Sequence, residues 1–186
     1  MPDPEFLLLG DALWLDFVNT TAACTRPELL PDPAAYLRWT KAVRVDPPGD
    51  AAAFEEARRL REHLLSLARA LDGSRNPPPA AIEAVNRSLA MLEGREHLLR
   101  VGGSWQIRFA PARPPTALEA IARSAGETLA NPLALVRRCA NPECSLFFVD
   151  ESTHQHRRWC SPSRCGLGYR VERRRRTRPT PLLAES

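Results

Sequence analysis

The fold of the C-terminal part of the chain is decided by Cys139-Ala-Asn-Pro-Glu-Cys144, followed after fifteen residues by Cys160-Ser-Pro-Ser-Arg-Cys165. Each pair can supply two ligands from a short turn. The intervening loop brings the second pair back to the first, so that all four cysteines can bind the same metal ion. Four thiolates at about 2.3 Å satisfy the tetrahedral coordination of zinc. Because four sulfurs leave no position for water, we predict one structural Zn²⁺ and no catalytic metal.

Two disulfides and an iron–sulfur cluster are the alternatives for the same four cysteines. Disulfides belong to oxidising compartments, whereas residues 1–5 are acidic where a secretory signal carries basic residues. The sequence also has no apolar run of about 20 residues that could span a membrane. We therefore expect a cytoplasmic, nucleoid-associated protein with no membrane partner. His154 and His156 lie between the pairs, in a polar stretch that we expect to be a solvated loop.

Local patterns around the cysteines predict the shape of this unit. Residues 146–149 are apolar and predict a short strand, and residues 157–160 are expected to return as its partner. Ser161 and Pro162 are typical of the N-cap and first position of a helix. A knuckle, a hairpin and a helix that carries the last cysteine together predict a treble-clef-like zinc finger.

Positive charge is concentrated in the same part of the chain. Residues 137–178 contain eleven arginines and four acids, whereas residues 1–136 contain fifteen basic and seventeen acidic groups. Arginine suits phosphate because its planar fork donates two parallel hydrogen bonds and stays charged. We predict that double-stranded DNA is contacted by Arg157, Arg158, Arg164, Arg170, Arg173, Arg174, Arg175, Arg176 and Arg178. A protein-interaction module for an acidic partner and an RNA-binding module are the alternatives.

These residues resemble a known arrangement. The cysteine pairs, Arg157-Arg-Trp-Cys160-Ser, and Cys165-Gly166 before an arginine-rich segment resemble the CGNR zinc finger. Leu15-Asp-Phe-Val-Asn-Thr20 and the glycine hairpin near residues 101–106 resemble the ABATE domain that precedes this finger in bacterial proteins. The resemblance covers about residues 6–178 and implies a stress-responsive transcriptional regulator with a DNA-binding finger. Leu167 and Gly168 replace the family's usual Asn and Arg, which leaves the zinc ligands intact but removes one arginine.

The remainder of the chain predicts a mainly helical body. We expect a short strand over residues 6–9, then either a helix capped by Asp11 or a second strand. Further helices are expected after Asp32, after Asp50, over residues 82–92 and after the capping box of Thr116 and Glu119, with a hairpin that turns at residues 102–104. The predicted fold class is α+β: an ABATE-like helical domain over residues 1–132, with a small antiparallel hairpin, then a zinc finger with a basic helix over 133–178 and a tail over 179–186.

Catalytic motifs are lacking in the sequence: there is no glycine-rich phosphate loop, no H-E-x-x-H, and His63, His97 and Cys24 are isolated. We therefore predict a regulator and no enzyme. Asp16 and Asn19 lie one helical turn apart and predict either a buried structural network or a site for a small-molecule effector. Because one short finger covers little DNA, we also expect a homodimer.

Overall fold

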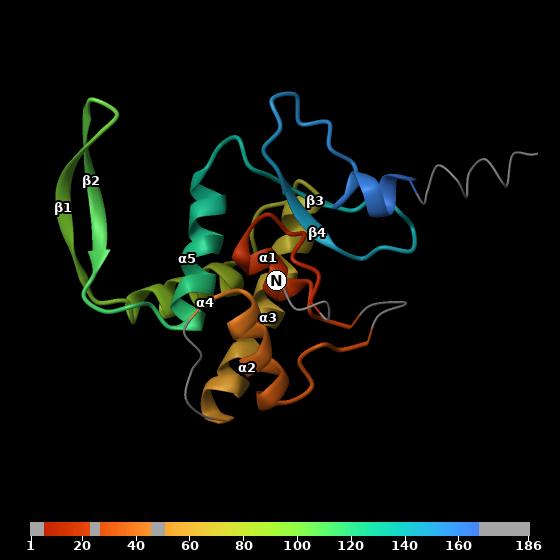
Figure 1. The fold of residues 1–186 in the computed structure, drawn as a ribbon, viewed down its shortest axis with the longest axis horizontal. Helices are drawn as coiled ribbons and strands as arrows, with labels where there is room; N and C mark the ends of the chain where they lie inside the picture. The colour runs from red at the N-terminus through yellow and green to blue at the C-terminus, as the bar shows by residue number, and fades with distance from the viewer. Residues whose placement is uncertain (1–5, 23–26, 46–50, 168–186) are drawn as a thin grey trace, which may run out of the picture.

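The computed structural model describes residues 6–22, 27–45 and 51–167. Its helical body is built around α3 (Ala51–Asp72), with α1 (Leu13–Val18), α4 (Pro79–Ala90) and α5 (Ala117–Ala130) packed against it, and α5 also packs against α1 and α4 (Figure 1). In α3 the apolar residues recur at three- and four-residue spacing and face this core; the buried ones are Phe54, Ala57, Leu60, Leu64, Leu67 and Ala68. Among the described residues, no helix combines the length and the apolar character needed to cross a bilayer.

Helix α1 settles the ambiguity at the start of the chain. Four of its five apolar residues, Trp14, Leu15, Phe17 and Val18, are buried because α3, α5 and strand β4 (Phe147–Asp150) cover the helix on several sides. Asp11 does not cap this helix as expected, since the N-cap is Ala12 without a side-chain bond. The strand predicted over residues 6–9 is also wrong: these residues are irregular, with Phe6 in the main core.

Two predicted helix starts are confirmed by their caps. The side chain of Asp32 accepts a hydrogen bond from the Ala35 amide and caps α2 (Pro33–Ala42). Thr116 and Glu119 form the reciprocal capping box at the start of α5. Helix α4 spans Pro79–Ala90 where a helix over residues 82–92 is expected, and Gly94 begins a strand. The cap predicted at Asp50 lies outside the described residues.

The part of the chain that the structure describes forms two sheets, and each is a separate two-stranded antiparallel hairpin. Strands β1 (Gly94–Val101) and β2 (Ser104–Pro111) form the predicted hairpin, which projects from the ends of α4 and α5 (Figure 1). Strand β4 (Phe147–Asp150) is the predicted apolar strand, but its partner is β3 (Leu135–Arg138), and residues 157–160 form no strand. Strand β3 lies before the first cysteine pair and provides the partner of β4. Residues 157–160 therefore need not pair with β4, and they follow an irregular path.

The second sheet packs on the helical body. Val136, Phe147 and Val149 belong to the same buried cluster as the helices, whereas Phe148, on the other face of β4, packs with Leu146, Cys139 and Cys160. Alternation along β4 therefore gives one face to the body and the other to the cysteines. This arrangement fixes the position of the cysteine cluster relative to α1 and α3.

Candidate metal centre

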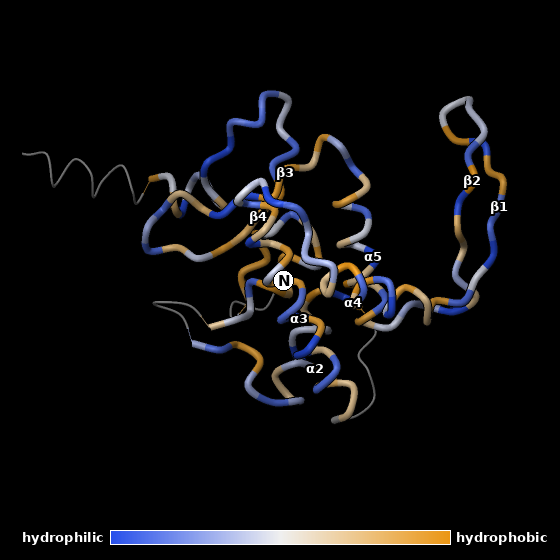
Figure 2. The backbone as a smooth tube through the Cα atoms, turned by 180° about the vertical axis from the view of Figure 1, so that it is seen from behind, coloured by the Kyte–Doolittle hydropathy of each residue, from blue (hydrophilic) through white to orange (hydrophobic). Residues whose placement is uncertain are grey.

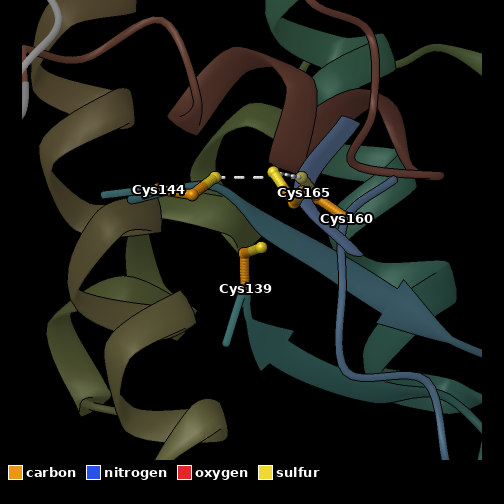
Figure 3. Close-up of side chains that lie close together, drawn as sticks. All are labelled: Cys139, Cys144, Cys160 and Cys165. Carbon is orange, nitrogen blue, oxygen red and sulfur yellow. Dashed lines mark hydrogen bonds between the residues drawn. The ribbon is translucent and has the colours of Figure 1, made fainter. Parts of the chain in front are cut away.

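The four C-terminal cysteines converge on one point (Figure 3). Their Sγ atoms all lie within 4.8 Å of one another, with Cys144 and Cys160 at 3.8 Å and Cys160 and Cys165 at 3.6 Å. A tetrahedron of sulfurs at about 2.3 Å from zinc has edges of about 3.8 Å. The sulfur positions therefore fit one Zn²⁺, and four soft sulfur donors are the set that zinc prefers.

Short-range hydrogen bonds hold each pair in place. In the first pair, the Cys139 amide donates to the Leu146 carbonyl at 2.9 Å and the Cys144 amide to the Asn141 carbonyl at 2.9 Å, which closes the knuckle. The second pair straddles the start of a single helical turn, η1 (Pro162–Gly166). Ser161 caps this turn as predicted, because its Oγ accepts from the Arg164 amide, and the turn is a π-helix.

The electrostatics of the cluster are consistent with a bound cation. The Cys160 thiol hydrogen-bonds to Cys144 and thereby lowers the pKa of Cys144 to about 5. The same hydrogen bond raises the pKa of Cys160, and burial raises that of Cys165 to about 11. One thiolate thus suppresses ionisation of its neighbours, and a bound metal ion would offset this repulsion. Because Cys139 and Cys160 are buried and four sulfurs close the shell, the zinc is structural.

The motif at the start of the chain connects the body to this centre. Asn19 is buried, and its amide group makes two hydrogen bonds with the backbone of Phe147: Nδ2 donates to the carbonyl at 2.9 Å and Oδ1 accepts from the amide at 2.8 Å. Thr20 follows and accepts from Arg61 at 2.8 Å. Arg61 is itself buried and paired with Glu28 at 2.7 Å. The Asn-Thr pair therefore joins α1 to β4 and to α3.

Comparison with protein families agrees with this architecture. A model for the ABATE family, described as "Putative stress-induced transcription regulator", matches residues 11–132, and a model for the CGNR zinc finger matches residues 136–178. The chain belongs to the ABATE family. Both matching families are regulatory or zinc-finger families, and neither is enzymatic. No curated protein shows significant similarity to the chain.

Within the CGNR finger, Arg157 has a structural position that the sequence did not indicate. Its guanidinium donates to the carboxylate of Asp11 at 2.5 Å and to the carbonyls of Trp159 and Cys160, and it stacks on the Phe148 ring at 4.5 Å. These contacts connect the loop between the cysteine pairs to the ABATE domain. They leave little of this guanidinium for a phosphate, although the sequence placed Arg157 among the DNA contacts.

Asp150 is a second residue that the sequence analysis missed. Its carboxylate is fully buried and accepts from the Ser152 amide and hydroxyl and from the Arg157 amide, and it pairs with Arg137 at 3.3 Å. Burial alone would raise the pKa of Asp150, but these hydrogen bonds and the Arg137 charge hold it below the usual value. Asp150 therefore organises the loop after β4. A single acidic residue after a strand does not by itself predict such a role from the sequence.

The remaining predicted DNA contacts fall into two groups. Arg158 and Arg164 are exposed, and Arg158 lies over the Trp159 ring at 5.4 Å. The others lie outside the described residues: Arg170, Arg173, Arg174, Arg175, Arg176 and Arg178. His154 and His156 are exposed, in agreement with the predicted solvated loop.

Two neighbouring surface depressions bring further arginines toward the finger. One, of about 280 Å³, is lined by both arginines at the end of β3 and by Arg157 and Arg158. The other, of about 440 Å³, is lined by Arg69 and Arg75 of the ABATE domain and by Arg138. Arg138 is exposed and borders both depressions, and Asp72 is the acid among the described residues that line them. The basic surface thus extends from the finger onto the end of α3.

Asp16 and Asn19 do not form one site. Asn19 borders the 440 Å³ depression and is bonded to Phe147, whereas Asp16 lines a different cavity of about 570 Å³ with Lys41 and Arg44. The Asp16 carboxylate accepts from the Gly10 amide at 2.8 Å, and burial raises its pKa to about 6. The contacts of Asn19 are those of a buried structural network.

Proposed function

We propose that the protein is a DNA-binding transcriptional regulator in which the CGNR finger and the adjoining end of the ABATE domain contact the phosphates of double-stranded DNA. The carrying observation is the position of Arg138, which is exposed and borders two depressions that also contain Arg69, Arg75 and Arg158. Zinc supports this surface by fixing the chain on both sides of it. The residues of the arginine-rich tail, beginning with Arg170, extend the same positive charge in sequence.

The chemistry of these groups favours backbone contacts over base reading. Guanidinium groups form bidentate hydrogen bonds with phosphate, which provide affinity and orientation but carry no sequence information. Gly168 stands where the resemblance to the CGNR finger implies an arginine, so one guanidinium group is lacking after the last ligand. We therefore propose that recognition of specific bases depends on few side chains in this protein.

Binding of a fluorescent duplex by the full-length, zinc-loaded protein tests this proposal. Arg138→Gln and Arg158→Gln should each weaken binding for all duplex sequences and lower the slope of log K against log salt by about 0.9. Arg87→Gln, at an exposed position on α4, is the charge-matched control and should leave binding unchanged. Equal losses in all three variants would mean that only net charge matters. Stronger binding of single-stranded RNA than of duplex DNA would favour an RNA-binding module.

We also propose that the ABATE domain senses a small effector, at the 570 Å³ cavity lined by Asp16, Lys41 and Arg44. This volume is within the range of small-molecule sites, and the cavity offers charges of both signs. Melting temperature in the presence of amino acids and small organic acids tests the idea. A stabilising ligand should lose its effect in Lys41→Gln, whereas absence of any stabilising compound in the series argues against an effector at this cavity.

The proposed domain boundaries remain those of the sequence: residues 1–132, 133–178 and 179–186. The first boundary falls between α5 and β3, where the chain passes from the helices to the second sheet. Because Val136, Phe147 and Val149 lie in the core of the body, we propose that the finger does not fold independently of the ABATE domain.

A further inference from the structure

The hairpin of β1 and β2 stands apart from the rest of the molecule. It extends beyond the ends of α4 and α5 in both views (Figures 1 and 2), and none of its residues belongs to either buried cluster of the described chain. Gly102 and Gly103 form its turn with φ of 56° and 87°, the conformation that two-residue hairpins need. A two-stranded hairpin alone is at best marginally stable in water, so this one requires a further surface to pack on.

One face of the hairpin is apolar at its centre. The register places Leu98 opposite Ile107, Arg100 opposite Trp105, and Glu96 opposite Phe109, and residues directly opposite each other lie on the same side. Exposed fractions are 62% for Leu98, 66% for Trp105, 68% for Ile107 and 37% for Phe109. Together these side chains present on the order of 400 Å² of apolar surface, in the range of patches that mark interaction sites.

The two charges on this face identify the partner. Glu96 lies toward the base of the hairpin and Arg100 toward its tip, with Leu98 and Ile107 between them. They are about 13 Å apart along one strand, too far to pair with each other. When a second identical face is laid on the first in the opposite direction, each Glu96 meets Arg100 of the second copy. The same operation places Phe109 beside Trp105 of the second copy and the two apolar centres in contact.

We propose that this hairpin face is a homodimer interface, formed by two copies that pack antiparallel about a two-fold axis near Leu98 and Ile107. Such an interface is self-complementary in both charge and apolar surface, as a two-fold dimer requires. The opposite face carries Arg95, His97, Gln106 and Arg108 and stays exposed in the dimer. It also carries Leu99 and Val101, which are 47% and 40% exposed, but no phenylalanine, tyrosine or tryptophan. A homodimer is also expected from the small footprint of the finger on DNA. The hairpin face provides an interface for it that does not depend on DNA binding.

Sedimentation equilibrium of the full-length, zinc-loaded protein tests this proposal. Ile107→Asp should weaken the dimer at least about a hundredfold, because it places a charge at the apolar centre. Leu133→Asp is the control, since Leu133 is 69% exposed and lies outside the hairpin. Circular dichroism and zinc content should match the wild type in both variants, because neither residue is buried.

The charge pair provides a second, more specific test. Glu96→Arg and Arg100→Glu should each weaken the dimer about tenfold, and the double variant should restore it, because the pairs then re-form with reversed sign. A wild-type monomer at all concentrations, a dimer unaffected by Ile107→Asp, or a double variant no better than the singles would overturn the proposal. A monomer whose duplex affinity falls on Trp105→Ala would instead assign the hairpin to DNA.

Discussion

Replacing Asn19 by Ala should destabilise the whole protein, because this side chain joins the ABATE domain to the finger. The substitution removes two buried hydrogen bonds, of 2.8 and 2.9 Å, and leaves the amide and carbonyl of Phe147 without these partners. Each buried backbone group left unsatisfied costs about 1–3 kcal/mol. The expected loss is therefore about 2–5 kcal/mol of unfolding free energy. For a protein of this size that corresponds to a fall in melting temperature of roughly 5–15 °C.

Urea denaturation followed by circular dichroism measures this loss, with Asn86→Ala as the matched control at an exposed position on α4. The control should change the free energy of unfolding by about 0.5 kcal/mol or less. Zinc release to a chelator should be faster in Asn19→Ala than in the control. Asn19 holds Phe147 at the start of β4, and the preceding residue, Leu146, packs in the cysteine cluster. A loss below about 1 kcal/mol in Asn19→Ala would refute the reasoning, because the two bonds would then contribute little to holding the finger.

Three further substitutions have distinct expected outcomes. Cys144→Ser should abolish stoichiometric zinc in elemental analysis and unfold the finger while the helical signal persists, because metal binding at such sites contributes on the order of 10–16 kcal/mol; full zinc occupancy would contradict this. Arg157→Ala should lower the free energy of unfolding by about 2–4 kcal/mol in thermal or urea unfolding, since several acceptors lose their donor. Arg158→Ala should leave stability unchanged and weaken duplex binding. The reverse result for the two variants would exchange the roles assigned to these arginines. Asp16 has a pKa raised to about 6 in the folded state, so its ionisation destabilises the protein as pH rises from about 4 to 6. Asp16→Asn should therefore gain stability relative to the wild type across this window, by up to about 3 kcal/mol, and an unchanged difference between the two proteins at pH 4 and 7 would contradict it.

Local signals account for the parts of the fold that could be predicted from sequence. Asp32 before Pro33 and the capping box of Thr116 and Glu119 each act within a few residues, and they mark helix starts that the structure confirms. The cysteine spacing acts the same way, because each pair is set by a short turn and a metal ion accepts only one geometry. The glycine pair at 102–103 fixes the hairpin turn for a similar reason.

Features that depend on distant partners could not be predicted. The amide of Asn19 meets Phe147 across 128 residues, and Arg157 meets Asp11 across 146, and neither pairing leaves a local trace. For the same reason β4 was assigned the wrong partner strand. The apolar run at residues 6–9 resembles a strand, but it joins neither of the two sheets among the described residues, and Leu7 and Leu9 pack on the cysteine cluster instead.

The most direct test of the central claim is the salt dependence of duplex DNA binding by the wild-type protein and by a variant with Arg173, Arg174, Arg175 and Arg176 changed to Gln. Each phosphate contact contributes about 0.9 to the slope of log K against log salt on B-DNA. The account predicts salt-dependent binding by the wild type and a slope smaller by about 3 in the variant, with affinity reduced for every duplex sequence. A wild-type protein that binds no duplex at low ionic strength would contradict the account and favour an interaction module for an acidic protein.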